Sequence, residues 1–173
     1  MQNSKDFTIN QSSYLLVELP EQFIPDHFSR VYYDIQVAGL RPIITHPERN
    51  PLLQRKPELL EEWVSIGCLV QVTAQSYTGG FGSLAQKYAE RLLDAGSIHF
   101  FASDAHDVRR RPPILSRCYR KVAKAVGEEI ADLLLRKNPE AVINGLPLPS
   151  PPENEEVEYE SPKRGWLGRL FRR

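Results

Sequence analysis

Ile98-His99-Phe100-Phe101 is a short apolar run, and Ala102-Ser103-Asp104-Ala105-His106-Asp107 follows it directly. The apolar run is typical of a strand buried in a sheet. Asp104 and His106 leave the end of this strand close enough for both side chains to reach one metal ion. The basic, proline-bounded run Arg109-Arg110-Arg111-Pro112-Pro113 comes next. Metal-ligand types beside arginines indicate a site for a phosphate ester.

Three earlier runs have the same character as the first. Tyr14–Val17, Pro42–Thr45 and Cys68–Thr73 are each short, apolar and rich in β-prone residues. Between these strands, and again after Pro113, apolar residues recur at helical spacing. The predicted helices start at Asp26, Pro57, Ser83 and Glu128, and a further one follows Pro113. A last turn is predicted to be capped by Asn138, and Ala74–Gly82 is predicted to be a loop. Strands that alternate with helices predict an α/β fold with a parallel sheet.

Polar side chains recur where the predicted strands end. Glu18, His46 and Gln75-Ser76 stand at such positions, as do Asp104 and His106. In βα-barrels the active site is assembled at these carboxyl ends, from several strands. The shared position is stronger evidence than any single residue, for which a structural hydrogen bond remains the simpler interpretation.

Glu18, His46, Asp104 and His106 are therefore candidate metal ligands. An oxygen and nitrogen set without cysteine favours a divalent ion such as manganese, iron, magnesium or zinc. A metal of this kind polarises a phosphoryl oxygen and turns bound water into a nucleophile near neutral pH.

Arg49 and Arg111 are the candidates for holding the phosphate, because a guanidinium pairs with two oxygens at once and stays charged. Asp107 is a candidate partner for the ring of His106, since ligating histidines usually donate their second N–H to an acceptor. Glu48 is expected either to serve a ligand in the same way or to cap a turn.

The composition excludes several classes of protein. The chain has 173 residues, of which 41% are hydrophobic and 25% charged, as is typical of a globular protein. Its net charge is zero, so general nucleic-acid binding is not expected. No apolar run approaches the ~20 residues that a bilayer span needs. Its two cysteines, Cys68 and Cys118, lie in apolar patterns and predict reduced core residues in a cytoplasmic protein. Neither is followed at the right distance by the arginine that a thiolate phosphatase needs.

The composition changes near the end of the chain. Residues 1–146 are expected to form the folded domain, and residues 147–173 a Pro/Glu-rich disordered linker with a basic and aromatic tail. Five glutamates lie in residues 153–160, and one lysine and four arginines in residues 163–173. This tail suits an anionic membrane surface or a partner, which predicts a protein peripheral to the inner face of the membrane; a solvated tail is the alternative.

Five motifs together resemble one known family. Tyr14–Glu18, His46–Asn50, Gln71–Ser76, Ala102–Asp107 and Arg111–Pro113 are similar, in this order, to the polymerase-and-histidinol-phosphatase (PHP) superfamily. The most similar branch comprises the manganese-dependent tyrosine phosphatases of bacterial capsule and exopolysaccharide operons. The resemblance runs from about Ser12 to Gly145.

The resemblance implies a distorted (β/α) barrel with a manganese cluster that hydrolyses phosphotyrosine on a membrane-linked tyrosine kinase. By matching position, Glu18, His46, Asp104 and His106 would be metal ligands, and Arg49 and Arg111 would hold the phosphate. The family's first His-x-His motif, a further histidine and a bridging glutamate have no counterpart here. The chain is therefore expected to be the C-terminal portion of such a barrel, incomplete at the N-terminus.

Two other functions remain open at this stage. One is a non-catalytic half-barrel that acts as a binding or interaction module. The other keeps the phosphatase chemistry for a small phosphomonoester such as histidinol phosphate. The sequence around His46–Asn50 and Ser103–Asp107 favours a protein substrate.

Overall fold

The structure, a computed structural model, describes residues 4–21, 23–25 and 27–151. Four strands form one parallel sheet in the order of the chain: β1 (Tyr14–Val17), β2 (Arg41–Thr45), β3 (Leu69–Thr73) and β4 (Phe100–Ala102). The predicted strands and the α/β fold class are confirmed. Because every strand runs in the same direction, all four carboxyl ends meet at one edge of the sheet.

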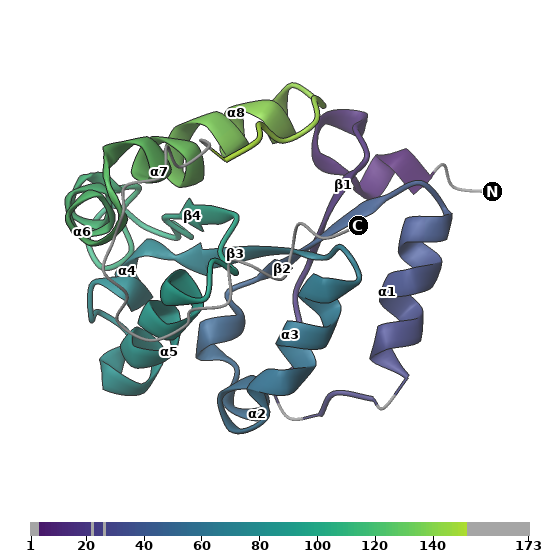
Figure 1. Ribbon diagram of the computed structural model, residues 1–173, viewed down its shortest axis with the longest axis horizontal. Helices are drawn as coiled ribbons and strands as arrows, with labels where there is room; N and C mark the ends of the chain where they lie inside the picture. The colour runs from purple at the N-terminus through teal and green to yellow at the C-terminus, as the bar shows by residue number, and fades with distance from the viewer. Residues whose placement is uncertain (1–3, 22, 26, 152–173) are drawn as a thin grey trace, which may run out of the picture.

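Helices cover both faces of the sheet (Figure 1). One face carries α1 (Phe28–Val37), α3 (Pro57–Ser65) and α5 (Gly82–Asp94), and the other carries α7 (Glu128–Asp132) and α8 (Asn138–Ile143), with α6 (Ser116–Val126) beside α7. The short elements are η1 (Ser4–Phe7), η2 (Ile9–Gln11), η3 (Pro47–Arg49), α2 (Pro51–Arg55), α4 (Ala74–Tyr77) and the π-helical η4 (Leu133–Lys137).

Alternate residues of the strands build two separate cores. Ile43 belongs to a cluster that includes Val142 of α8, whereas its neighbour Ile44 belongs to the main cluster with Trp63 of α3. Side chains of a strand point to opposite faces in turn, so a sheet covered on both sides needs apolar residues at consecutive positions. This explains why the strands read as continuous apolar runs.

Cys68 and Cys118 are free and buried, as predicted. Burial raises the pKa of each thiol to about 12. Both thiols therefore stay protonated near neutral pH, which removes the nucleophile that a cysteine mechanism requires.

Three local predictions are wrong. Helix α5 begins at Gly82, so Ser83 lies inside it and is not its cap. Ala74–Tyr77, predicted as loop, forms α4. Asn138 does not cap a separate turn, because the backbone is helical on both sides of it, and its side-chain amide donates to the carbonyl of His99 at 2.9 Å.

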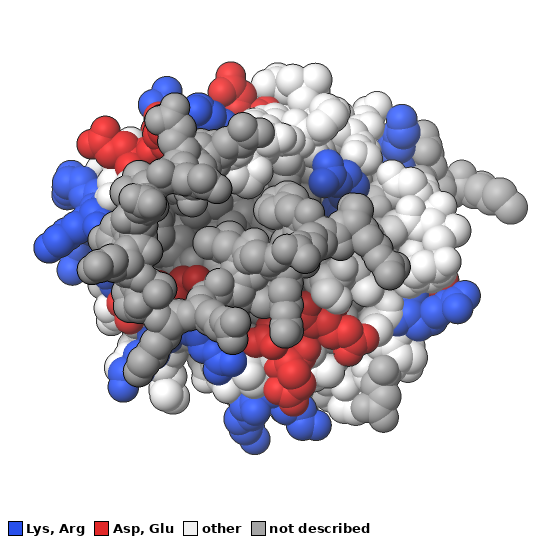
Figure 2. All heavy atoms as spheres, in the orientation of Figure 1, with Lys and Arg blue, Asp and Glu red and all other residues white. Residues whose placement is uncertain are grey.

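Several other predictions lie outside the described residues. They are the capping role of Asp26, the glutamate run and the basic tail. No helix in the described part of the chain is long and apolar enough to cross a membrane. Basic and acidic side chains are interspersed around the face seen in Figure 2, in keeping with a net charge of zero.

Candidate active site

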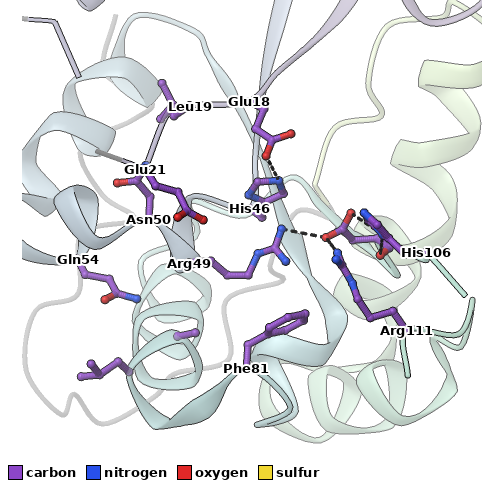
Figure 3. A pocket seen from close by; sticks show the side chains of 13 residues that line it. Glu18, Leu19, Glu21, His46, Arg49, Asn50, Gln54, Phe81, His106 and Arg111 are labelled. Atoms are coloured by element: carbon purple, nitrogen blue, oxygen red, sulfur yellow. Dashed lines mark hydrogen bonds and ion pairs between the residues drawn. The ribbon is translucent and has the colours of Figure 1, made fainter. Parts of the chain in front are cut away.

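A pocket of about 640 Å³ lies at the carboxyl ends of the strands. All six residues predicted from sequence to bind metal or phosphate line it: Glu18, His46, Arg49, Asp104, His106 and Arg111. They come from the segments after β1, β2 and β4. Figure 3 shows the side chains of Glu18, His46, Arg49, His106 and Arg111 converging. The structure thus brings the whole predicted set together.

His46 enters the pocket through an unusual backbone conformation. Its φ and ψ are 36° and 48°, in the left-handed region that few non-glycine residues adopt. Its amide donates to the carbonyl of Gln71 at 2.8 Å, and its Nε2 lies 3.4 Å from Oε1 of Glu18. Burial, followed by the positive charge of Arg49, lowers the pKa of His46. The imidazole therefore favours its neutral form, which is the form that ligates metals.

Asp104 also has a left-handed backbone, with a φ of 50°. Strained conformations of this kind persist where the surrounding structure holds them, often at functional sites. Nδ1 of His106 lies 2.8 Å from the backbone oxygen of Asp104. Because a carbonyl only accepts, this bond places the ring proton on Nδ1 and leaves Nε2 as an acceptor.

Arg49 and Arg111 meet at the carboxylate of Asp104. Nη2 of Arg49 lies 2.9 Å from Oδ2 of Asp104, and Nη2 of Arg111 bonds the same oxygen. Nε of Arg111 is buried and has no hydrogen-bond partner among the described residues. Two guanidinium charges against the one carboxylate that they share leave this side of the pocket positively charged, which suits an oxyanion, while Glu18 and Glu21 line other parts of the pocket.

The donor side chains do not converge as a complete metal site. In residues 4–21, 23–25 and 27–151, no three His, Cys, Asp or Glu side chains are grouped closely enough to hold an ion. The candidates form two pairs instead, Glu18 with His46 and Asp104 with His106. Stable sites for divalent ions use more ligands than one such pair offers. The donor types suit a metal, but their arrangement does not by itself fit one, and metal ligation stays a prediction.

Glu48 and Asp107 differ from their predicted role as partners of ligating histidines. The fully buried Glu48 accepts the amide N–H of Thr73 at 3.2 Å, which ties η3 to the end of β3. Burial raises the pKa of Glu48 to about 7. Asp107 accepts the amides of Arg110 and Arg109 at 2.6 and 2.7 Å, and these bonds lower the pKa of its carboxyl group. Both carboxylates hold the loops that carry site residues, because each accepts hydrogen bonds from backbone amides.

Phe81 also lines this pocket, although no role was predicted for it from the sequence. The guanidinium carbons of Arg49 and Arg111 lie over its ring, at 4.8 and 5.5 Å from the centroid. The sequence feature that could have identified Phe81 as a site residue is an aromatic side chain between Gly80 and Gly82, in a segment that follows a predicted strand.

A family model described as capsular polysaccharide synthesis, CpsB/CapC, matches residues 1–144. The chain belongs to the CpsB/CapC family. Among its relatives, CapC of Staphylococcus aureus is 35% identical over 168 residues, a match that covers 94% of this chain and 62% of CapC. The tyrosine-protein phosphatase YwqE of Bacillus subtilis is 36% identical over 136 residues, which covers 75% of this chain and 54% of YwqE.

A solved structure supports the membership of the CpsB/CapC family. The crystal structures of YwqE and of CpsB from Streptococcus pneumoniae are described as those of metal-dependent tyrosine phosphatases. One chain from this work matches with a TM-score of 0.79 and 33% identity, covering 84% of this chain and 59% of that one. The present chain thus spans little more than half the length of the relatives that it matches. The sequence-based assignment to the capsule branch of tyrosine phosphatases is confirmed at the level of the family.

Proposed function

We propose that this chain provides the phosphate-binding side of an active site that hydrolyses phosphotyrosine. The observation that carries the proposal is the meeting of Arg49 and Arg111 in one pocket, where Nε of Arg111 has no partner among the described residues. Relatives named tyrosine-protein phosphatases support the reaction class.

The chain's own residues suggest how a phosphate monoester would bind. The two guanidinium groups would each direct N–H donors at the phosphoryl oxygens, in place of Oδ2 of Asp104. Such donors also stabilise the charge that develops during phosphoryl transfer. The imidazoles of His46 and His106 line the same pocket, and burial together with the charge of Arg49 favours the neutral form of His46.

Metal dependence is part of the proposal, because the solved relatives are described as metal-dependent. Manganese is the proposed ion, with iron, magnesium and zinc as the alternatives. Among the described residues, the two donor pairs do not form a complete metal site, and they do not support a catalytic step at a metal. Because the relatives are longer, activity with each of the four metals should be measured for this chain and for a full-length relative.

The substrate and the setting are also proposals. We propose a phosphotyrosine protein of the capsule-synthesis machinery, namely a membrane-linked tyrosine kinase, as the partner, with the phosphatase in the cytoplasm. The family description supports the setting in capsule synthesis, and the names of the relatives support a phosphotyrosine substrate. A panel that contains phosphotyrosine peptides, phosphoserine and histidinol phosphate distinguishes a protein substrate from a small phosphomonoester.

The direct test measures binding and turnover separately. Binding of inorganic phosphate is measured by calorimetry, and hydrolysis of a phosphotyrosine peptide is measured with Mn²⁺ and with a chelator. Arg49→Ala and Arg111→Ala should each weaken phosphate binding at least tenfold, a loss of about 1.4 kcal/mol or more. Arg30→Ala is the matched control, because Arg30 pairs with Asp34 on the exposed surface of α1. Equal phosphate binding by all four proteins would contradict the proposal.

A binding module without turnover is the second candidate, favoured by the lack of three converging metal donors in the described residues. It predicts phosphopeptide binding that depends on Arg49 and Arg111, with no hydrolysis in any of the four metals. Turnover by the purified chain would exclude it.

A further inference from the structure

We propose that Phe81 is a positioning residue that holds both phosphate-binding arginines in their working geometry. The inference rests on the proposed phosphate-binding role of Arg49 and Arg111 and assigns them a shared support. The guanidinium carbons lie 4.8 Å and 5.5 Å from the centroid of the Phe81 ring. In Figure 3 the ring lies beside both arginines at the wall of the pocket.

The local chain places this ring in the pocket rather than in the core. Phe81 directly precedes α5, between β3 and that helix. Gly79, two residues before it, and Gly82, directly after it, have φ values of 93° and 87°. These left-handed angles favour glycine and allow the chain to turn sharply before the helix. Phe81 keeps 36% of its surface exposed, so core packing does not account for its position.

The two arginines need a support because they come from different segments and carry the same charge. Arg49 belongs to η3 after β2, whereas Arg111 belongs to the loop after β4. Both reach one oxygen of Asp104, where their mutual repulsion opposes the shared geometry. The negative face of an aromatic ring attracts both cations and offsets part of that repulsion.

An aromatic contact of this kind also leaves the arginines free to bind. A guanidinium stacks through its flat face, while its N–H donors point outward in the plane. Phe81 can therefore hold both groups whether their donors face Asp104 or a phosphate. A carboxylate alone cannot do this, because it competes with the phosphate for the same donors.

The test compares variants of Phe81 in the intact chain, with inorganic phosphate as the probe. Phe81→Leu removes the ring and should weaken phosphate binding about tenfold, as expected from two partly exposed cation–π contacts. Phe81→Tyr keeps the ring and should bind within about twofold of the original chain. Phe81→Met serves as a second ring-free variant. Tyr33→Leu is the control, since it removes a similar contact, with Arg30 at 5.4 Å, on α1.

A second readout reports the contact itself. The Nε–Hε NMR signals of Arg49 and Arg111 should shift on loss of the ring in Phe81→Leu and stay close to their original positions in Phe81→Tyr. Tyr33→Leu should move the signal of Arg30 alone. A purely structural role for Phe81 predicts a lower melting temperature with no specific change at these two arginines.

The outcomes separate this inference from the proposed function. If the arginine variants lose phosphate and the ring-free variants do not, the inference about Phe81 is overturned while the phosphate site stands. If the original chain binds no phosphate, both are overturned. Weaker binding in Phe81→Leu and Phe81→Met, with recovery in Phe81→Tyr, supports the inference.

Discussion

Nη2 of Arg49 lies 2.9 Å from Oδ2 of Asp104, a contact that joins the turn after β2 to the loop after β4. Arg111 bonds the same oxygen, so one carboxylate neutralises part of the charge of two guanidinium groups. The ends of strands that are not neighbours in the sheet are connected through this single side chain.

The first prediction concerns Asp104→Asn. The substitution removes a negative charge that repels phosphate and competes for the donors of both arginines. Phosphate binding in the presence of a chelator should tighten about fivefold, close to 1 kcal/mol, while any metal-dependent turnover should fall. Calorimetry measures the binding. Asp34→Asn on α1 is the matched control and should leave phosphate binding unchanged. Weaker phosphate binding by Asp104→Asn would show that Asp104 orders the arginines more than it competes with the ligand.

The second prediction concerns the buried carboxyl group of Glu48. Glu48→Ala leaves the buried amide of Thr73 without its acceptor and should lower the free energy of unfolding by about 3 kcal/mol. Glu48→Gln keeps an acceptor oxygen and should stay within about 1 kcal/mol of the original chain. Urea denaturation measures both. Glu62→Ala, at an exposed position of α3, should change stability by less than about 0.5 kcal/mol. Equal losses in the Ala and Gln variants would contradict this role of the hydrogen bond.

The third prediction is a pH dependence that arises from His99. Its Nδ1 accepts the amide of Val70 at 3.1 Å, and burial lowers its pKa to about 4. The unfolded chain takes up this proton near pH 6.5, whereas the folded chain resists it down to about pH 4. Between these values, acidification should therefore lower the contribution of His99 to the free energy of unfolding by up to about 1.4 kcal/mol per pH unit. Glu48, whose pKa burial raises to about 7, contributes with the opposite sign in the same interval.

The variant His99→Asn tests this assignment, because asparagine offers an acceptor that does not titrate. Acidification across the same interval should destabilise this variant less than it destabilises the original chain. His27→Asn, at an exposed position just before α1, is the control and should retain the original slope. An unchanged slope in His99→Asn would assign the pH dependence to other groups.

The fourth prediction concerns metal. Because the described donors form two separate pairs, millimolar Mn²⁺ should raise the melting temperature of this chain by less than about 2 °C relative to a chelator. Scanning fluorimetry measures the shift, and elemental analysis measures the metal content after dialysis. Stoichiometric metal retained by the purified chain would show that the pairs close into a site when an ion is present.

The amino-acid pattern by itself determined the strands and the edge where the site lies. Tyr14–Val17 matches β1 exactly, and the other three strands were located to within two residues at either end. The reason is local, since apolar runs separated by helical spacing leave few arrangements other than a parallel sheet. Glu18, His46 and Asp104 follow strand ends, so their meeting at one pocket follows from the parallel direction of the strands.

Only the tertiary structure decided which atoms meet within that pocket. Asp104 pairs with Arg49 and Arg111, Glu48 turns to the amide of Thr73, and Phe81 lies against both arginines. Each contact joins loops whose conformation depends on packing against other elements, including the left-handed backbones of His46 and Asp104. Hydrophobic periodicity carries no information on such rotamers and loop paths, because it records burial and not the direction of a polar side chain.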